Sequence, residues 1–473
     1  MKPDDFRKHA HELVEWMANY MENVEDYPVK SQVPPGEIFS KIPDKPPLKA
    51  EPFESLMQDL DNIIMPGISH WQSPNFFAYF PANVSPPSIL AEMLISGLGA
   101  QCMIWETSPA AAELEEKMMI WLRDMIGLPI EFEGVIQDSA STATLSAILT
   151  AREKATAFSI NESGAFNADT LRVYCSEQTH SSIEKAVKIS GIGRKNLIKI
   201  PVKDDFSMDA VKLKETIMRD MESGYIPACV VATLGTTGTT AVDPLRAIGE
   251  ICRESGTHLH VDAAMAGTAL ILPELQWMLD GKEYIDSFVF NPHKWMFTNF
   301  DCSAYFVKDA TSLIKTFEVL PEYLKTRTRG KVNDYRDWGV PLGRRFRALK
   351  LWSVIRSYGV EGLREKVKEH IKFASRLSEM ILAEDDFEIL APVILSVVCF
   401  RYHPSGFTES QVNQINEKLN HELNDSGKMY LSHTVLNGKY TLRMVTAQTN
   451  VTLGHVEKAW SLILETARAT RIV

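Results

Sequence analysis

The chain has 473 residues, of which 45% are hydrophobic and 23% are charged, and its formal net charge is -11. This length exceeds one small core and predicts roughly two or three lobes of a globular protein. The negative charge disfavours a nucleic-acid-binding surface, and no stretch approaches the roughly 18 apolar residues of a membrane span.

Residues 1–21 predict an amphipathic helix, because apolar side chains recur at helical spacing in this stretch. Asp4 and Asp5 add negative charge where the helix begins. The Pro-rich stretch 27–52 cannot form regular structure and is interpreted as an ordered strap or a linker. A first helix followed by such a strap often packs outside its own lobe, which indicates an arm that contacts a second subunit.

Residues 70–81, His-Trp-Gln-Ser-Pro-Asn-Phe-Phe-Ala-Tyr-Phe-Pro, are rich in aromatic side chains. Aromatic clusters usually belong to a core. The nearby prolines, however, indicate a loop, and aromatic residues on loops more often line a pocket. Two helical patterns follow between residues 88 and 128.

From Gly134 onward, short strands alternate with helices. This alternation predicts a mostly parallel, seven-stranded sheet covered on both faces, in which ligands bind beyond the carboxyl ends of the strands. One helix should begin with a capping box formed by Ser181 and Glu184. The predicted strands are 134–136, 171–175, 196–201, 227–234, 258–261, 287–290 and 303–307; the helices are 143–154, 209–222 and 244–254; a small α/β lobe has strand 393–401, helix 408–422 and strand 439–445.

The cysteines are scattered and include no C-x-x-C pair. This pattern is typical of buried free thiols in a reducing compartment, and it disfavours a disulfide framework or a zinc site. Residues 1–20 also lack the apolar core of a signal peptide, so we expect a cytoplasmic protein without a bound metal. The cysteines are Cys102, Cys175, Cys229, Cys252, Cys302 and Cys399.

The residues that follow the predicted strands are the candidates for cofactor binding and catalysis. Small residues from Ser139 to Ser141 begin a helix, whose free backbone N–H groups can seat a phosphate. His180 follows strand 171–175, a glycine- and hydroxyl-rich run, 235–240, follows strand 227–234, and Asp262 follows strand 258–261. A carboxylate at a buried strand end is costly without a partner.

The stretch 287–295, Ser-Phe-Val-Phe-Asn-Pro-His-Lys-Trp, places Lys294 between a buried strand and a bulky aromatic residue. Removal from water lowers a lysine pKa, and a neutral amine can form a Schiff base with a carbonyl. The alternative is a lysine that reaches solvent from a strand end. An acid, a histidine and a phosphate seat at neighbouring strand ends favour pyridoxal 5'-phosphate, whose pyridine nitrogen needs a carboxylate partner.

Four motifs together resemble the group II pyridoxal-phosphate decarboxylases, and within them the aromatic L-amino-acid decarboxylases. They are Ala232-Thr-Leu-Gly-Thr-Thr-Gly, His258-Leu-His-Val-Asp-Ala-Ala, Asn291-Pro-His-Lys-Trp and Pro341-Leu-Gly-Arg-Arg-Phe. The resemblance implies a fold type I homodimer, similar to aspartate aminotransferase, with its active site at the subunit interface. It also implies an N-terminal helical dimerisation segment (1–85), a large cofactor-binding α/β domain (86–356) and a small C-terminal α/β domain (357–473).

The resemblance further implies roles for individual residues. Lys294 would hold the cofactor as a Schiff base, Asp262 would pair with the pyridine nitrogen, and His180 would stack on the ring and face the substrate carboxylate. The other cofactor contacts would come from Ser139, Ala140, Ser141, Thr237, Ala264, Asn291 and His293. The substrate would meet Trp71, Tyr79, Phe80, Pro81, Gln101, Met103, His180 and Gly343, with Gln101 and Met103 from this chain or from its partner.

The implied reaction converts an aromatic L-amino acid to an arylethylamine and CO2. Tyr323, in Pro321-Glu-Tyr-Leu-Lys, would return a proton to Cα, and the polar residues 325–334 would form a lid. Aldehyde synthases of the family carry Phe at the Tyr323 position or Asn at the His180 position, so this chain predicts simple decarboxylation. Gly343 leaves room for an indole, which favours tryptophan or 5-hydroxytryptophan over dopa, tyrosine and phenylalanine. An aldehyde synthase and an aminotransferase are the alternatives.

Overall fold

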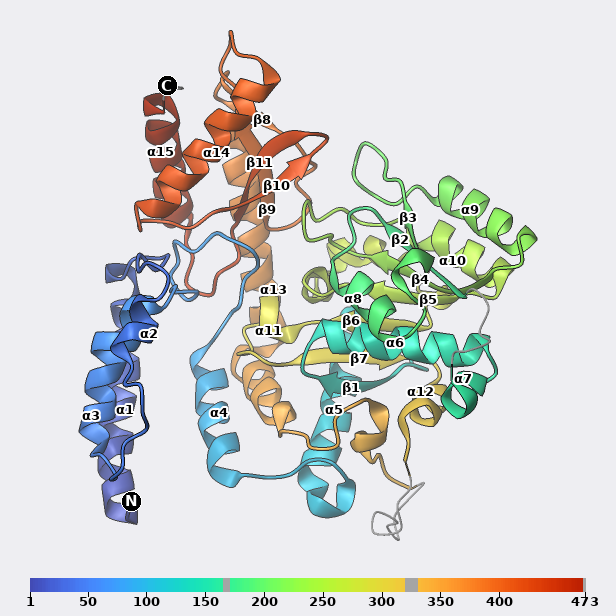
Figure 1. Cartoon of the computed structure of the whole chain (residues 1–473), viewed down its shortest axis with the longest axis horizontal. Coiled ribbons are helices and arrows are strands. Elements are labelled where there is room, and N and C mark those ends of the chain that lie inside the picture. The colour runs from blue at the N-terminus through green and yellow to red at the C-terminus, as the bar shows by residue number, and fades with distance from the viewer. Residues whose placement is uncertain (165–170, 320–330, 471–473) are drawn as a thin grey trace. The chain divides into compact units, whose positions relative to one another are not determined.

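The computed structural model describes residues 1–164, 171–319 and 331–470 (Figure 1). The chain divides into two compact units. The larger unit comprises residues 82–374 and 391–397, and the smaller unit comprises residues 1–81, 375–390 and 398–473. The three domains proposed from the sequence stay a prediction. In the described ranges, no helix is both long enough and apolar enough to cross a membrane.

The larger unit is built on one sheet of seven strands in the order β1-β7-β6-β5-β4-β2-β3. The neighbours from β6 to β3 are parallel, whereas β7 runs antiparallel to both β1 and β6. The mostly parallel sheet predicted from the sequence is therefore confirmed. Its strands are β1 (Glu133–Gln137), β2 (Leu171–Ser176), β3 (Leu197–Ile200), β4 (Ile226–Thr233), β5 (His258–Asp262), β6 (Ser287–Phe290) and β7 (Ser303–Val307).

Helices cover this sheet because its central strands are apolar on both faces. Helix α6 packs against β1 and β4 to β7, and its small residues Ala143 and Ala147 lie in one core cluster with Val135, Val289 and Tyr305. The helices of this unit are α4 (Pro86–Leu98), α5 (Pro109–Ile126), α6 (Ala140–Ala155), α7 (Ser159–Ser163), α8 (Ser182–Ile189), α9 (Ala210–Glu222), α10 (Leu245–Ser255), α11 (Pro292–Trp295), α12 (Ala310–Phe317) and the first part of α13 (Arg347–Leu382).

Two helix starts differ from the prediction. Helix α6 begins at Ala140 because Ser139 caps it, with the Ser139 hydroxyl accepting the Thr142 N–H at 3.2 Å. The predicted capping box of Ser181 and Glu184 is wrong. Ser181 already has helical backbone angles, φ -60° and ψ -16°, and its side chain makes no cap hydrogen bond. A capping side chain needs an extended backbone at that position.

The smaller unit contains a four-stranded sheet in the order β10-β11-β9-β8. The predicted strand 393–401 begins only at Val397, and the stretch 27–52, which was predicted to lack regular structure, contains a five-residue helix, Glu37–Lys41. Two strands were not predicted: β8 has three residues, and four of the five side chains of β10 are partly buried or exposed. Such strands are too short or too polar to show in an apolar pattern. The elements are α1 (Pro3–Glu22), α2 (Glu37–Lys41), α3 (Phe53–Asp59), β8 (Phe387–Ile389), β9 (Val397–Tyr402), α14 (Glu409–Asp425), β10 (Ser432–Leu436), β11 (Lys439–Val445) and α15 (Leu453–Ala469).

All six cysteines are free and buried. This confirms the prediction of buried free thiols. Burial raises the pKa of Cys102 to about 11 and that of Cys302 to about 12. These thiols are therefore protonated near neutral pH and are poor nucleophiles.

Candidate functional site

The predicted cofactor-contacting residues lie at or soon after the carboxyl ends of strands of the larger unit. Asp262 is the last residue of β5, and the one-turn helix α11, which carries Lys294, follows β6. The Asn291 N–H donates to the Ala264 carbonyl at 2.9 Å, and the Lys294 N–H donates to the Asn291 carbonyl at 2.9 Å. Pro292 at the first helical position suits the start of α11, since its missing N–H is not needed there. The backbone thus places Lys294 next to the end of β5.

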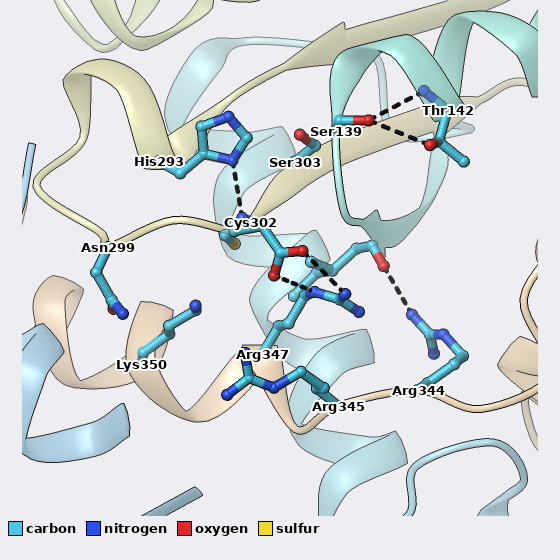
Figure 2. Close-up of polar contacts among 12 residues, drawn as sticks. Ser139, Thr142, His293, Asn299, Cys302, Ser303, Arg344, Arg345, Arg347 and Lys350 are labelled. Atoms are coloured by element: carbon cyan, nitrogen blue, oxygen red, sulfur yellow. Dashed lines mark hydrogen bonds and ion pairs between the residues drawn. The ribbon is translucent and has the colours of Figure 1, made fainter. Parts of the chain in front are cut away.

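The start of α6 has backbone N–H groups that could bind a phosphate. Ser139 caps the helix through Thr142 (Figure 2), so the remaining N–H groups of the first turn are available to an anion. Asn291 is buried, and its Oδ1 accepts the Ser303 hydroxyl at 2.6 Å, which leaves the amide NH2 as a donor. These groups are donors of the kind that bind a phosphate.

His293 is held as a neutral donor. Its Nδ1 accepts the Cys302 N–H at 2.8 Å (Figure 2). Burial, and next the charge of Lys294, lower the pKa of His293 to about 3. A backbone N–H can only donate, so the ring carries its proton on Nε2. His293 therefore offers an N–H group without a positive charge.

Asp262 is a carboxylate that is buried at the end of β5. Its side chain accepts the Ala264 N–H at 3.0 Å and is 5% exposed. Among the described residues, no Lys, Arg or His nitrogen lies within 4.0 Å of this carboxylate. A buried charge without a partner is costly. A protonated pyridine nitrogen supplies the missing donor and charge, so this residue fits pyridoxal 5'-phosphate.

His180 lies in the electrostatic field of the same site. Partial removal from water is the largest influence and lowers the pKa of His180. The charge of Asp262 raises this pKa and the charges of Lys294 and Lys185 lower it, so the pKa lies below its ordinary value. The His180 Nδ1 lies 3.2 Å from the Ser182 nitrogen, which donates to it, and 2.8 Å from the Ser182 hydroxyl oxygen. The charges of Asp262 and Lys294 therefore both act on the His180 ring.

The glycine- and hydroxyl-rich run after β4 is a tight turn. The Gly235 and Thr236 N–H groups both donate to the Ala241 carbonyl, at 2.9 and 3.0 Å. Gly235 has φ +78°, and a Cβ there would lie 2.6 Å from the Ala266 Cβ, so only glycine fits. The Thr237 side chain is exposed, and its predicted place beside the ring stays a prediction.

Hydrogen bonds join two predicted substrate-contacting segments of the larger unit, one with Gln101 and one with Gly343. The Gln101 Oε1 accepts the Arg344 N–H at 2.7 Å, and the Cys102 N–H donates to the Arg344 carbonyl at 3.0 Å. The buried Arg344 guanidinium donates to the Glu115 carboxylate at 2.6 Å and to the Ile136 carbonyl at 2.8 Å. Gln101 and Gly343 are therefore anchored to β1 and α5. Met103 lies on the same segment as Gln101.

The remaining predicted substrate residues belong to the smaller unit. Phe76 and Phe77 are fully buried, so a core role holds for this part of the aromatic loop. Trp71 stacks on Phe76 with ring centroids 4.5 Å apart. Tyr79 is 46% exposed and its hydroxyl lies 3.0 Å from that of Tyr430. The pocket role of Trp71, Tyr79, Phe80 and Pro81 stays a prediction, and Tyr323 lies outside the described residues.

Three residues that orient the site were not predicted from the sequence. Cys302 holds His293, Ser303 holds Asn291, and Ser182 holds His180. Cys302 and Ser303 lie where β7 begins, beside the end of β6. A prediction that β7 pairs with β6 in antiparallel fashion would have placed both residues beside the end of β6. For Ser182, the signal was a serine two residues after a histidine at a helix start.

Known pyridoxal-dependent decarboxylases are similar to this chain over almost its whole length. Residues 35–403 match the model of the pyridoxal-dependent decarboxylase conserved domain. Tyrosine decarboxylase 3 of Petroselinum crispum is 42% identical over 99% of this chain and 93% of its own length. Phenylacetaldehyde synthase of Petunia hybrida is also 42% identical, over 98% of this chain and 94% of its own.

A solved structure extends this likeness to the fold. The crystal structure of Oryza sativa TDC with PLP and tryptamine has a TM-score of 0.97 at 36% identity, and the match covers 100% of this chain and 99% of that chain. Fold type I and pyridoxal 5'-phosphate as the cofactor are thereby confirmed. The chain belongs to the pyridoxal-dependent decarboxylase family, among relatives that include aromatic amino-acid decarboxylases and aldehyde synthases.

Proposed function

We propose that this enzyme removes CO2 from an aromatic L-amino acid and releases the corresponding arylethylamine. The proposal rests on His180, whose Nδ1 accepts the Ser182 N–H at 3.2 Å and whose pKa is influenced by the charges of Asp262 and Lys294. When bound, pyridoxal 5'-phosphate supplies an electron sink for the bond that breaks. Lys294 would attach it covalently, Asp262 would hold a proton at its ring nitrogen, and Asn291 and His293 would bind its phosphate.

A neutral His180 suits the loss of a carboxylate. Its Nε2–H can orient the substrate carboxylate by one hydrogen bond without balancing the negative charge. An imidazolium would stabilise that charge in the bound substrate, and the stabilisation would be lost as the charge leaves the departing CO2. Binding that is stronger in the ground state than in the transition state slows a reaction.

Tyr323 decides between amine and aldehyde as the product. We expect Tyr323→Phe to lower amine formation about a hundredfold or more, because Cα loses its proton donor. The electron-rich carbon is then open to O2, and each substrate, with one O2 and one water, gives one aldehyde, one CO2, one ammonia and one H2O2. Aldehyde and peroxide should be measured beside the wild type at equal oxygen. If the variant makes no more of either than the wild type, our assignment of Tyr323 is wrong.

Aldehyde synthesis by the wild type is the second candidate function. It is supported by phenylacetaldehyde synthase among the relatives, 42% identical to this chain. The same assay separates the two, since a wild type that releases peroxide in step with CO2 is an aldehyde synthase. An aminotransferase would instead accumulate pyridoxamine phosphate and require a keto acid.

A substitution at Gly343 tests which aromatic side chain the enzyme prefers. We propose tryptophan or 5-hydroxytryptophan first, because a glycine leaves space for the bicyclic ring. We expect Gly343→Ser to lower kcat/KM for tryptophan about tenfold and to change kcat/KM for tyrosine by less than about twofold. A Cβ at residue 343 would lie 3.7 Å from the Gln101 Nε2, an ordinary contact, so the variant should fold.

A matched control is Gly362→Ser, where the added Cβ meets the Tyr358 Cβ at 3.8 Å, outside the predicted site. This variant should leave both values unchanged. Steady-state kinetics with tryptophan, dopa, tyrosine and phenylalanine ranks the substrates by trapped CO2 and released amine. Tyrosine as the preferred substrate of the wild type would refute the indole proposal. An unchanged tryptophan-to-tyrosine ratio in Gly343→Ser would refute the role of Gly343.

A homodimer is part of this proposal. Helix α4 exposes Leu90, Leu94 and Leu98, which are 60%, 60% and 64% exposed and lie four residues apart on one face. An apolar row of this kind is typical of a protein interface. Sedimentation should give twice the chain mass of 53.2 kDa. Leu94→Glu should shift the mass toward one chain, whereas Ile130→Glu, at an isoleucine that is 81% exposed, should not. A wild-type mass of one chain would contradict the dimer.

A further inference from the structure

Ser182 presents both of its hydrogen-bonding groups to the same ring atom. Its backbone nitrogen lies 3.2 Å from the His180 Nδ1, and its hydroxyl oxygen lies 2.8 Å from it. The Ser182 side chain is buried, and the hydroxyl makes no other hydrogen bond within the described part of the chain. A serine at a helix start usually caps its own helix. This one contacts the histidine instead.

The direction of these bonds determines which ring nitrogen carries the proton. A backbone N–H can only donate, so the His180 Nδ1 must keep its lone pair. A ring rotated by half a turn would place a C–H group against the two Ser182 donors. The favoured state is therefore one ring orientation, neutral, with the proton on Nε2 and pointing away from α8.

We propose that Ser182 is a positioning residue that holds His180 in this neutral Nε2–H form. The inference rests on the proposed decarboxylation, in which His180 faces the substrate carboxylate. It adds a residue that acts through His180 and touches neither substrate nor cofactor.

The charged groups around His180 explain why a positioning residue is needed. Asp262 at the end of β5 favours the imidazolium, whereas Lys294 on α11 and Lys185 on α8 oppose it. Binding a substrate adds another carboxylate, which would favour protonation further. The two Ser182 donors counter both carboxylates, because the imidazolium has no lone pair at Nδ1 to accept them.

The test is nuclear magnetic resonance of the PLP-loaded full chain labelled with [15N]histidine, with His180→Gln identifying the signal. In the wild type, Nδ1 should be unprotonated and Nε2 protonated. Ser182→Ala should raise the pKa of His180 by about 0.5 to 1 unit, since one of two donors to the neutral ring is lost. In the pH profile of kcat, the midpoint of the acidic limb should shift to higher pH by the same amount. On the alkaline plateau, kcat should stay within about twofold of the wild-type value.

Two variants serve as matched controls. Ser182→Thr keeps the hydroxyl and should restore both the wild-type pKa and the pH profile. Ser181→Ala removes the neighbouring hydroxyl, which is exposed and makes no cap bond, and should change neither quantity. If Ser182→Ala fails to fold, Ser182→Cys, which keeps a side chain of similar size but donates weakly, should give the same upward shift.

Each result decides the proposal. An unchanged His180 pKa in Ser182→Ala and Ser182→Cys, or a wild-type ring protonated on Nδ1, would overturn it. A His180 pKa that moves while the kcat limb stays fixed would also overturn it, because the tautomer would then not serve the reaction. A wild type that decarboxylates none of the aromatic amino acids would refute the proposed function, and the resonance data would then separately show whether Ser182 sets the tautomer.

Discussion

Lys294→Ala should lower kcat by at least about a thousandfold and remove the visible absorbance of the lysine-bound cofactor. The backbone at this position does not depend on the side chain. The Lys294 N–H donates to the Asn291 carbonyl at 2.9 Å, and the Lys294 carbonyl accepts the Asn83 N–H at 3.2 Å. Alanine preserves both bonds, so the loss should come from chemistry and not from unfolding.

Borohydride reduction followed by peptide mass spectrometry checks the attachment directly. Wild-type enzyme should carry the reduced cofactor on the peptide that contains Lys294, and the variant should carry none. Lys188→Ala, at an exposed lysine of α8, is the control and should keep both the label and the rate. A reduced cofactor found on a different lysine would show that our assignment is wrong.

Asp262→Asn should lower kcat about a hundred- to a thousandfold, which is the usual cost of removing one preorganised electrostatic contact. The amide oxygen can still accept the Ala264 N–H, now 3.0 Å from the carboxylate, so the local backbone should be kept. The neutral amide cannot balance a protonated pyridine nitrogen. The rise in Tm that PLP causes should therefore shrink in the variant, because ligand stabilisation depends on affinity for the folded state.

Asp286→Asn is the matched control for this experiment. Asp286 also accepts a backbone N–H, that of Leu259 at 2.8 Å, but it precedes β6, whereas Asp262 lies at the carboxyl end of β5. Its replacement should leave kcat within about twofold and leave the PLP-induced rise in Tm unchanged. If Asp262→Asn behaves like this control, Asp262 does not partner the ring nitrogen.

The amino-acid sequence by itself determined the sheet and the residues at its edge. Strands buried on both faces must be apolar along their length, and β4 and β7 are nearly so, which makes them visible as runs of letters. Parallel strands end at one edge, so Asp262 and Lys294 could be placed near each other without coordinates. Their chemical types then indicated the cofactor.

Only the tertiary structure decided how those residues are oriented and protonated. The antiparallel β7 lies between β1 and β6 and brings Cys302 to His293 and Ser303 to Asn291. Whether a histidine nitrogen accepts or donates depends on which N–H group lies opposite it in space. Sequence spacing does not record that direction, and for this reason the capping box at Ser181 was wrong while Ser182 was missed.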